Sequence, residues 1–212
     1  GVVISPLLSN IYMNRFLRVF HERGNDREHR ARLVSYADDF VILSRGCAES
    51  ALDWTRGVLG AIGLSLNETK TCIRDARRES FDFLGYSFGP DTSLRTGRRY
   101  LSARPSKKSM QRVRQNIRER LRRAITAPWR EVEADLNRLL RGWAGYFSYG
   151  TRLQAYRAID RHVYDRVRHF LRRRHKVSTR GTRRFSYKTL YGELGIVKLK
   201  TLTMPGRAVG VA

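Results

Sequence analysis

Two adjacent aspartates interrupt an otherwise apolar run near the start of the chain, and they constrain its fold more than any other feature. The run extends from Leu33 to Leu43, with Asp38 and Asp39 at its middle. A run of this composition is suited to burial inside a sheet, where unpaired carboxylates are costly and neighbouring ones repel each other. The pattern therefore predicts a β-hairpin with both aspartates at its tight turn, and a positive group beside them.

The aspartate pair allows two interpretations from the residues alone. Asp is a common turn residue, so the pair is compatible with an ordinary surface turn. Neighbouring carboxylates also suit a hard divalent cation, Mg²⁺ or Mn²⁺. The pair itself does not decide between a turn and a metal site, so the flanking sequence is needed.

Positive charge is concentrated in the second part of the chain. Residues 1–90 hold 12 Lys and Arg against 11 Asp and Glu, whereas the remaining residues hold 31 against 8. Most of these cations are Arg, whose guanidinium suits bidentate phosphate contacts and stacking on bases. The excess is larger than solubility requires, so it predicts a nucleic-acid partner for the second part.

Hydrophobic periodicity predicts the order of elements. Helices are expected over residues 5–23, 48–62, 106–125, about 128–147 and 151–175. The first has an apolar face from Leu8 and Ile11 to Phe16 and Phe20. A loop with a short strand is expected over residues 64–73, and one strand over residues 81–88. This order predicts an α+β fold with an antiparallel sheet, followed by a helical bundle.

Composition divides the chain into four parts: an α+β part (1–90), a basic linker (91–104), a helical region (105–176) and a basic tail (177–212) with a short turn or strand near residues 185–202. The chain starts at Gly1 instead of Met, so we expect an internal or truncated piece. Cys47 and Cys72 form no CxxC pair, which predicts free thiols, buried or half-buried, in a reducing compartment. No apolar run is long enough to span a membrane.

Several blocks resemble group II intron reverse transcriptases, in the same order, over about residues 1–200. Residues 5–11 resemble the segment before the palm hairpin, and Tyr36-Ala37-Asp38-Asp39 resembles the catalytic turn. Residues 63–71 are similar to the next block, and residues 83–86 to the turn that supports the primer end. The helix from residue 106 resembles the thumb, and residues 136–147 and 153–175 resemble the maturase-specific region.

The resemblance implies an RNA-directed DNA polymerase with intron maturase activity. Its fold would be a reverse-transcriptase palm-like antiparallel sheet with helices, followed by an all-α thumb and maturase bundle, so residues 1–90 would be a partial palm. Asp38 and Asp39 would hold two Mg²⁺ ions, with Mn²⁺ able to substitute. Lys70 would neutralise triphosphate charge, although the residues alone favour a solvated loop lysine. The nucleotide and primer site would comprise Tyr36, Ala37, Phe83, Leu84 and Gly85.

The resemblance also implies the partners, which are group II intron RNA, an RNA template with a DNA primer, and deoxynucleoside triphosphates. The candidate RNA-binding arginines are Arg112, Arg114, Arg118, Arg122, Arg123, Arg168, Arg172, Arg173 and Arg174. Tyr146, Tyr149 and Tyr187 are candidates for stacking on bases, with core packing favoured for Tyr146.

The family also needs a metal-binding Asp on an earlier palm strand, and no such strand precedes Gly1. We therefore expect a longer parent protein to polymerise and this piece alone not to. The alternative function is an RNA-binding splicing factor that descends from such an enzyme and no longer polymerises. A basic RNA-binding module with an accidental Asp-Asp turn would require the ordered blocks to be coincidence. The expected location is the bacterial cytoplasm.

Overall fold

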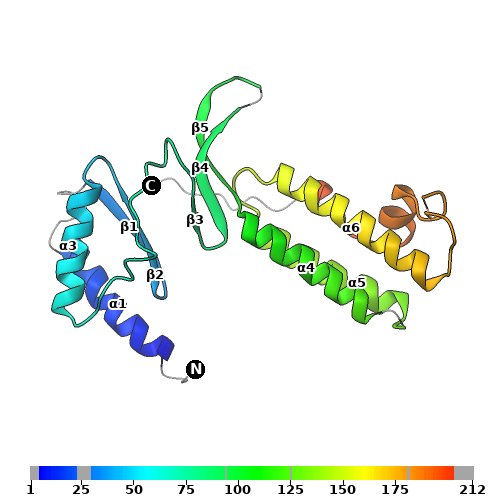
Figure 1. The fold of residues 1–212 in the computed structure, drawn as a ribbon, viewed down its shortest axis with the longest axis horizontal. Helices are drawn as coiled ribbons and strands as arrows, with labels where there is room; N and C mark the ends of the chain where they lie inside the picture. The colour runs from blue at the N-terminus through cyan, green and yellow to red at the C-terminus, as the bar shows by residue number, and fades with distance from the viewer. Residues whose placement is uncertain (1–4, 23–29, 94, 125, 181, 203–212) are drawn as a thin grey trace. The chain divides into compact units, whose positions relative to one another are not determined.

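A computed structural model describes residues 5–22, 30–93, 95–124, 126–180 and 182–202. The chain divides into two compact units, Gly1–Asp75 and Ala76–Ala212, and each is described by itself. Helices occur together with two small antiparallel sheets, which confirms the predicted α+β class (Figure 1). Within the described ranges, no helix combines the length and the apolar composition needed to cross a bilayer.

The first unit is a hairpin packed against two helices. Its elements are α1 (Ser5–Glu22), β1 (Ala31–Tyr36), β2 (Asp39–Ser44) and α3 (Ala48–Ala61). Strands β1 and β2 pair antiparallel, with Leu33 opposite Ile42. Because side chains alternate along a strand, Leu33 and Phe40 share the face that packs with Phe16 of α1 and Leu59 of α3.

The opposite face of the hairpin is uncovered. Tyr36 is 66% exposed, Leu43 50% and Val34 45%. The expectation that the whole aspartate-bearing run is buried is therefore wrong, because helices of this unit cover only one face of a two-stranded sheet. The first turns of α1 likewise expose Leu8 and Ile11, so the predicted apolar face of this helix is buried only from its middle onward.

The second unit begins with a sheet in the strand order β3-β4-β5. The strands are β3 (Phe81–Phe83), β4 (Tyr86–Thr92) and β5 (Arg99–Pro105). The prediction of one strand over residues 81–88 is wrong, because the chain reverses at Leu84 and Gly85, whose φ angles are 49° and 78°. Strand β4 also continues through Pro90. Strand β3 pairs with β4 only as far as Phe88. At Pro90 the side of β4 that faces β3 therefore has no strand to accept a backbone N–H, so a proline, which has none, is tolerated there.

Residues 91–104, predicted to be a linker, instead complete β4 and form most of β5. Asp91 lies opposite Tyr100, and the buried Ser102 hydroxyl donates a hydrogen bond to the Gly89 carbonyl at 3.2 Å. The segment looks like a linker in the sequence because the first residues of β5 are polar or basic and exposed. The division between compact units falls after Asp75 and not at this segment.

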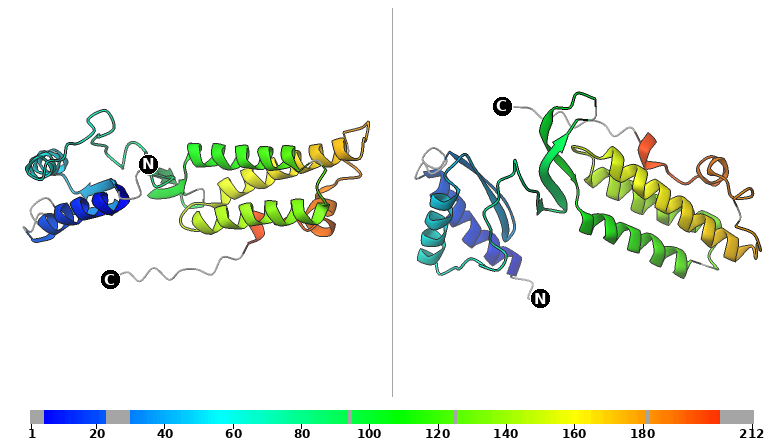
Figure 2. Two further views of the ribbon diagram at one scale, coloured as in Figure 1. Left: turned by 90° about the horizontal axis from the view of Figure 1, so that it is seen from below. Right: turned by 45° about the horizontal axis from the view of Figure 1, so that its top comes forward.

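Three helices follow as predicted and lie side by side (Figure 2). They are α4 (Lys107–Arg123), α5 (Trp129–Tyr146) and α6 (Leu153–Arg174). Ser106 caps α4, since its hydroxyl accepts a hydrogen bond from the Ser109 N–H at 3.2 Å. The apolar stripes meet in one core, where Ile117, Leu140 and Val163 are fully buried.

The segment after α6 is part of this core, although the sequence indicates a basic tail. It forms two short helical elements, Thr189–Glu193 and Leu199–Thr201, instead of a strand. Leu190 and Leu199 are fully buried. Two buried polar side chains hold the segment: the Asn137 amide bonds the backbone of Gly195 and Val197, and the Asp160 carboxylate accepts the N–H groups of residues 199 and 200 at 2.8 and 3.0 Å.

Asp160→Ala should lower the free energy of unfolding of the second unit by about 2 kcal/mol, because it leaves a buried backbone N–H without an acceptor. Urea unfolding of the whole chain measures this change. Asp165→Ala is the matched control, since it removes an exposed carboxylate from the same helix. Its surface ion pair should contribute less than about 0.5 kcal/mol. Equal effects of the two substitutions would contradict this role for Asp160.

Candidate active site and nucleic-acid interface

Both aspartates lie at the tip of the β1–β2 hairpin, which confirms the predicted turn. Tyr36 pairs with Asp39, so Ala37 and Asp38 alone form the turn. Ala37 has a φ of 55°, a left-handed conformation that two-residue hairpin turns normally give to glycine. An alanine held there costs about 1 kcal/mol, and strain of this kind is typical of functional sites.

Both carboxylates are exposed, so the expectation that they are buried is wrong, and burial does not require a positive group beside them. Their donor chemistry still fits a cation, because two adjacent carboxylates on an open turn present the oxygen ligands that Mg²⁺ and Mn²⁺ prefer. Within the described residues, no three or more His, Cys, Asp or Glu side chains gather. The pair therefore suits an ion that completes its coordination with water and substrate oxygens, as Mg²⁺ commonly does.

Lys70 lies on an exposed turn, where its N–H donates a hydrogen bond to the Asn67 carbonyl at 2.9 Å. The short strand expected in this region does not form. Lys70 and both aspartates of the turn are exposed. The contact of Lys70 with a triphosphate therefore stays a prediction.

The turn at Leu84 and Gly85, predicted to support a primer, is fixed by the helices of its own unit. The Tyr146 hydroxyl donates to the Leu84 carbonyl at 2.8 Å, and the Tyr86 hydroxyl donates to the Tyr146 carbonyl at 2.7 Å. The Ser109 hydroxyl donates to the Gly85 carbonyl at 2.9 Å. A Cβ at Gly85 would lie 2.9 Å from that hydroxyl oxygen, so glycine fits this approach best. The start of α4 and the end of α5 thus set the position of the turn.

The three candidate tyrosines differ in their surroundings. Tyr146 is 56% exposed, so the expectation that it packs in the core is wrong; its ring lies edge-on to Phe147 and its hydroxyl is occupied in the turn contacts. Tyr149 and Tyr187 are 60% and 42% exposed, and both keep ring surface that a base can contact. Phe83, on the other side of the turn, is half-buried.

The two cysteines are free, as expected. Cys72 is exposed, whereas a buried or half-buried thiol was expected.

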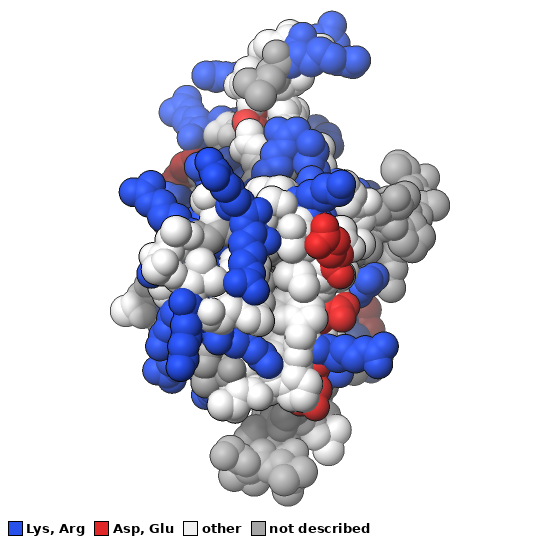
Figure 3. Space-filling model, turned by 90° about the vertical axis from the view of Figure 1, so that its right-hand side faces the viewer, with Lys and Arg blue, Asp and Glu red and all other residues white. Residues whose placement is uncertain are grey.

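Four of the five predicted arginines of α4 lie on its outer surface. Arg112, Arg118, Arg122 and Arg123 are exposed, and Arg114 is half-buried. Residues 118 and 122 are one helical turn apart, so they share a face. Figure 3 shows many Lys and Arg side chains on the side it presents, and fewer acidic ones.

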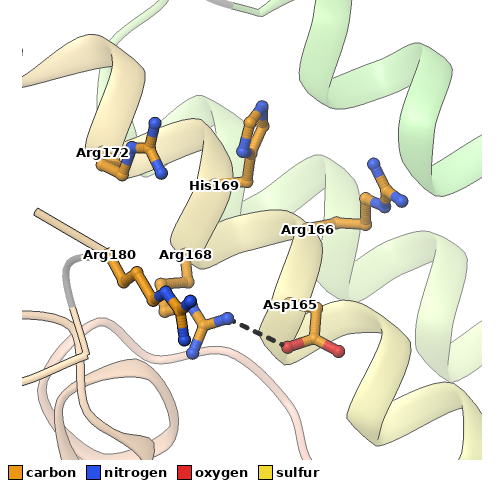
Figure 4. Close-up of a pocket in the computed structure, with 6 residues that line it drawn as sticks. All are labelled: Asp165, Arg166, Arg168, His169, Arg172 and Arg180. Atoms are coloured by element: carbon orange, nitrogen blue, oxygen red, sulfur yellow. Dashed lines mark hydrogen bonds and ion pairs between the residues drawn. The ribbon is translucent and has the colours of Figure 1, made fainter.

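The predicted arginines of α6 fall into different environments. Arg168 and Arg172 line one hollow of about 200 Å³ together with Arg180 (Figure 4). Arg173 is exposed. Arg174 instead packs within the unit, because it donates a hydrogen bond to the Ala127 carbonyl and lies over the ring of residue 170.

A second hollow of about 580 Å³ adjoins the first and shares Asp165 and Arg168 with it. We call the two hollows together the α6 groove. Its side chains from α6 are Arg157, Asp160, Arg161, Tyr164, Asp165, Arg166, Arg168, His169 and Arg172. Its side chains from the following segment are Arg180, Tyr187, Lys198 and Lys200.

The charge of the α6 groove comes from Arg and Lys. Burial lowers the pKa of His169 in the groove, and the guanidinium groups of Arg172, Arg173 and Arg166 lower it further. The imidazole is therefore neutral near pH 7. Burial raises the pKa of Asp160, and its carboxylate is occupied by backbone N–H groups.

Most residues of this groove were not predicted from the sequence, although some of them follow a helical spacing pattern. Arg157, Arg161, Tyr164 and Arg168 recur at spacings of four, three and four, which places them on one face of α6. No such pattern marks Lys198, because its position depends on how the last segment packs on the bundle.

The two units together define a class of protein. The first presents an open carboxylate pair on a strained hairpin turn, and the second is an arginine-rich helical bundle with a basic, partly aromatic groove. Such a chain combines a carboxylate pair whose chemistry suits a divalent cation with a basic surface whose chemistry suits nucleic acid, two features expected of proteins that carry out metal-dependent chemistry on nucleic acid.

Comparison with known families agrees with this class and makes it specific. Residues 1–88 match the model of the reverse transcriptase (RNA-dependent DNA polymerase) family. Residues 110–188 match the model of the group II intron maturase-specific domain. The two matches together support a fragment of a group II intron reverse transcriptase and maturase, as the sequence resemblance indicates.

The chain is also similar to Protein YkfC of Escherichia coli (strain K12), with 33% identity over 140 residues. The match covers 51% of this chain and 36% of that relative, so the chain spans about a third of the length of the curated relative.

Proposed function

We propose that the protein containing this chain is an RNA-directed DNA polymerase and a maturase of a group II intron. The observation that carries the proposal is the open Asp38-Asp39 turn in the reverse transcriptase part, followed in the chain by the basic bundle in the maturase-specific part. The first unit then belongs to a palm, and the bundle supplies the thumb and the surface for intron RNA.

Each candidate residue has one task in this proposal. Asp38 and Asp39 hold two Mg²⁺ ions, or Mn²⁺ in their place, and Asp38 is the more direct ligand by family resemblance. When bound, such ions supply the positive charge that stabilises the entering and leaving oxygens of phosphoryl transfer. Lys70 neutralises charge on a deoxynucleoside triphosphate. The turn at residues 83–85 supports the primer end, and Tyr146 holds that turn in position.

Primer extension tests the polymerase. The complete natural protein that contains this chain should extend a DNA primer on an RNA template when deoxynucleoside triphosphates and Mg²⁺ are present, and chelation should stop it. A protein that binds intron RNA tightly but extends no primer would support the alternative, an RNA-binding splicing factor. That alternative is kept because no third acidic side chain joins Asp38 and Asp39 within the described residues.

RNA binding by this chain should depend steeply on salt. If the α6 groove and its surroundings neutralise about six phosphates of a single strand, affinity should fall by about 10²- to 10³-fold between roughly 50 and 200 mM salt, because counterions are released on binding. Filter binding or fluorescence anisotropy across that range measures the slope. An affinity that does not change with salt would contradict phosphate recognition by the basic bundle.

A further inference from the structure

Aromatic rings lie among the cations of the α6 groove. The ring centroids of Tyr164 and Tyr187 are 4.4 Å apart, and those of Tyr187 and Tyr191 are 5.0 Å apart. Tyr187 lines the larger hollow and is 42% exposed. The groove therefore contains an aromatic side chain that its neighbours hold in place and that keeps surface open to a ligand.

Two cations of the groove are held by the same rings. The Lys198 ammonium lies 5.4 Å from the centroid of Tyr187, and the Arg168 guanidinium lies 5.0 Å from that of Tyr164. Side chains fixed in this way lose little conformational freedom when a ligand binds, which favours affinity.

The acidic groups of the groove do not cancel its charge. The Asp160 carboxylate accepts the backbone N–H groups of Leu199 and Lys200, and Asp165 pairs with Arg168 at 3.3 Å. Arg157 and Arg161 are exposed at the other end of the groove. Cations thus surround the aromatic ring, and an anionic ligand is expected.

The dimensions of the groove fit a segment of several nucleotides. From Arg157 to Arg172 the helix rises about 22 Å, at about 1.5 Å per residue. Cations along this length, with an exposed aromatic ring among them, combine the two features by which proteins bind unpaired nucleic acid: phosphate contacts and packing of bases on aromatic rings. In a duplex the base faces are covered by neighbouring bases, so Tyr187 would add nothing to its binding.

We propose that the α6 groove binds an unpaired segment of RNA, with a base against the exposed surface of Tyr187 and phosphates on the arginines along α6. The proposal rests on the RNA-binding function proposed above and specifies the form of the RNA at this surface. Neither the Lys198 nor the Lys200 side chain lies within the matched maturase-specific residues, so the groove extends beyond that match.

The test compares two probes and three variants in the 212-residue chain. The probes are an RNA strand without self-complementarity and the same strand annealed to its complement. Tyr187→Leu should weaken binding of the single strand by about 5- to 150-fold, the range found for loss of one base–aromatic contact, and leave duplex binding within about twofold. Tyr187→Phe keeps the ring and should keep the wild-type affinity for both probes.

Tyr100→Leu is the matched control, because Tyr100 is 41% exposed in the same unit and does not line the groove. It should leave both affinities within about twofold. Thermal melts of each variant separate a loss of binding from a loss of folding. The inference is overturned if Tyr187→Leu weakens both probes equally or neither of them, or if Tyr100→Leu has the same effect. If the wild-type chain binds neither probe, the proposed RNA-binding function fails as well.

Discussion

Asp38→Asn in the complete natural protein should lower the rate of RNA-directed DNA synthesis by about 10³-fold or more, because it removes a charged ligand from ions that stabilise the reacting oxygens. The same substitution should leave the melting temperature unchanged, since Asp38 is exposed and Asn is equally suited to a hairpin turn. Steady-state primer extension at saturating Mg²⁺ measures the loss. Asp39→Asn should also reduce activity, but less than Asp38→Asn does.

Asp53→Asn is the control for the loss of a negative charge from the first unit. Its side chain is 75% exposed on α3, where it pairs with Arg56. Because Arg56 keeps its second partner, Glu68, this change should have little effect on activity or folding. Undiminished synthesis by Asp38→Asn, or an equal loss in Asp53→Asn, would remove the aspartate turn from the catalytic site.

The sequence was sufficient to predict the elements whose cause is local. The three-and-four spacing of Ile117, Leu140 and Val163 with their neighbours predicted the three bundle helices, and all three residues are fully buried. The aspartate turn was likewise predictable, because polar residues between two apolar arms favour a hairpin. The exposure of the Asp38 and Asp39 carboxylates was not predictable, because it depends on what covers the second face of the hairpin.

Features that depend on distant contacts could not be predicted. Strand β5 is polar and basic at its start, and only its pairing with β4 distinguishes it from a linker. The last segment enters the core because Asn137 and Asp160, buried on two helices, supply hydrogen-bond partners for its backbone. Neither residue has a sequence pattern that assigns it this role. For the same reason the α6 groove was only partly predictable, since one of its walls belongs to that segment.

Gly150→Ala should lower the free energy of unfolding of the second unit by about 3 kcal/mol, combining left-handed strain with overpacking. Gly150 connects α5 to α6 with a φ of 68°, and an added Cβ would lie 2.2 Å from the backbone oxygen of Ala103. That oxygen cannot move aside easily, because it belongs to strand β5 and accepts a hydrogen bond from the Thr151 N–H at 2.8 Å. Scanning calorimetry should show a melting temperature lower by about 10 °C.

Two further glycines separate the causes of that loss. Gly97 has a φ of 66° but open space around its Cβ position, so Gly97→Ala should cost only the strain, about 1 kcal/mol. Gly142 lies within α5, also with open space, so Gly142→Ala should stabilise the unit by about 0.5–1 kcal/mol through helix propensity. If Gly150→Ala lowers the free energy of unfolding by no more than Gly97→Ala does, the close approach of the α5–α6 connection to β5 does not hold the sheet against the bundle.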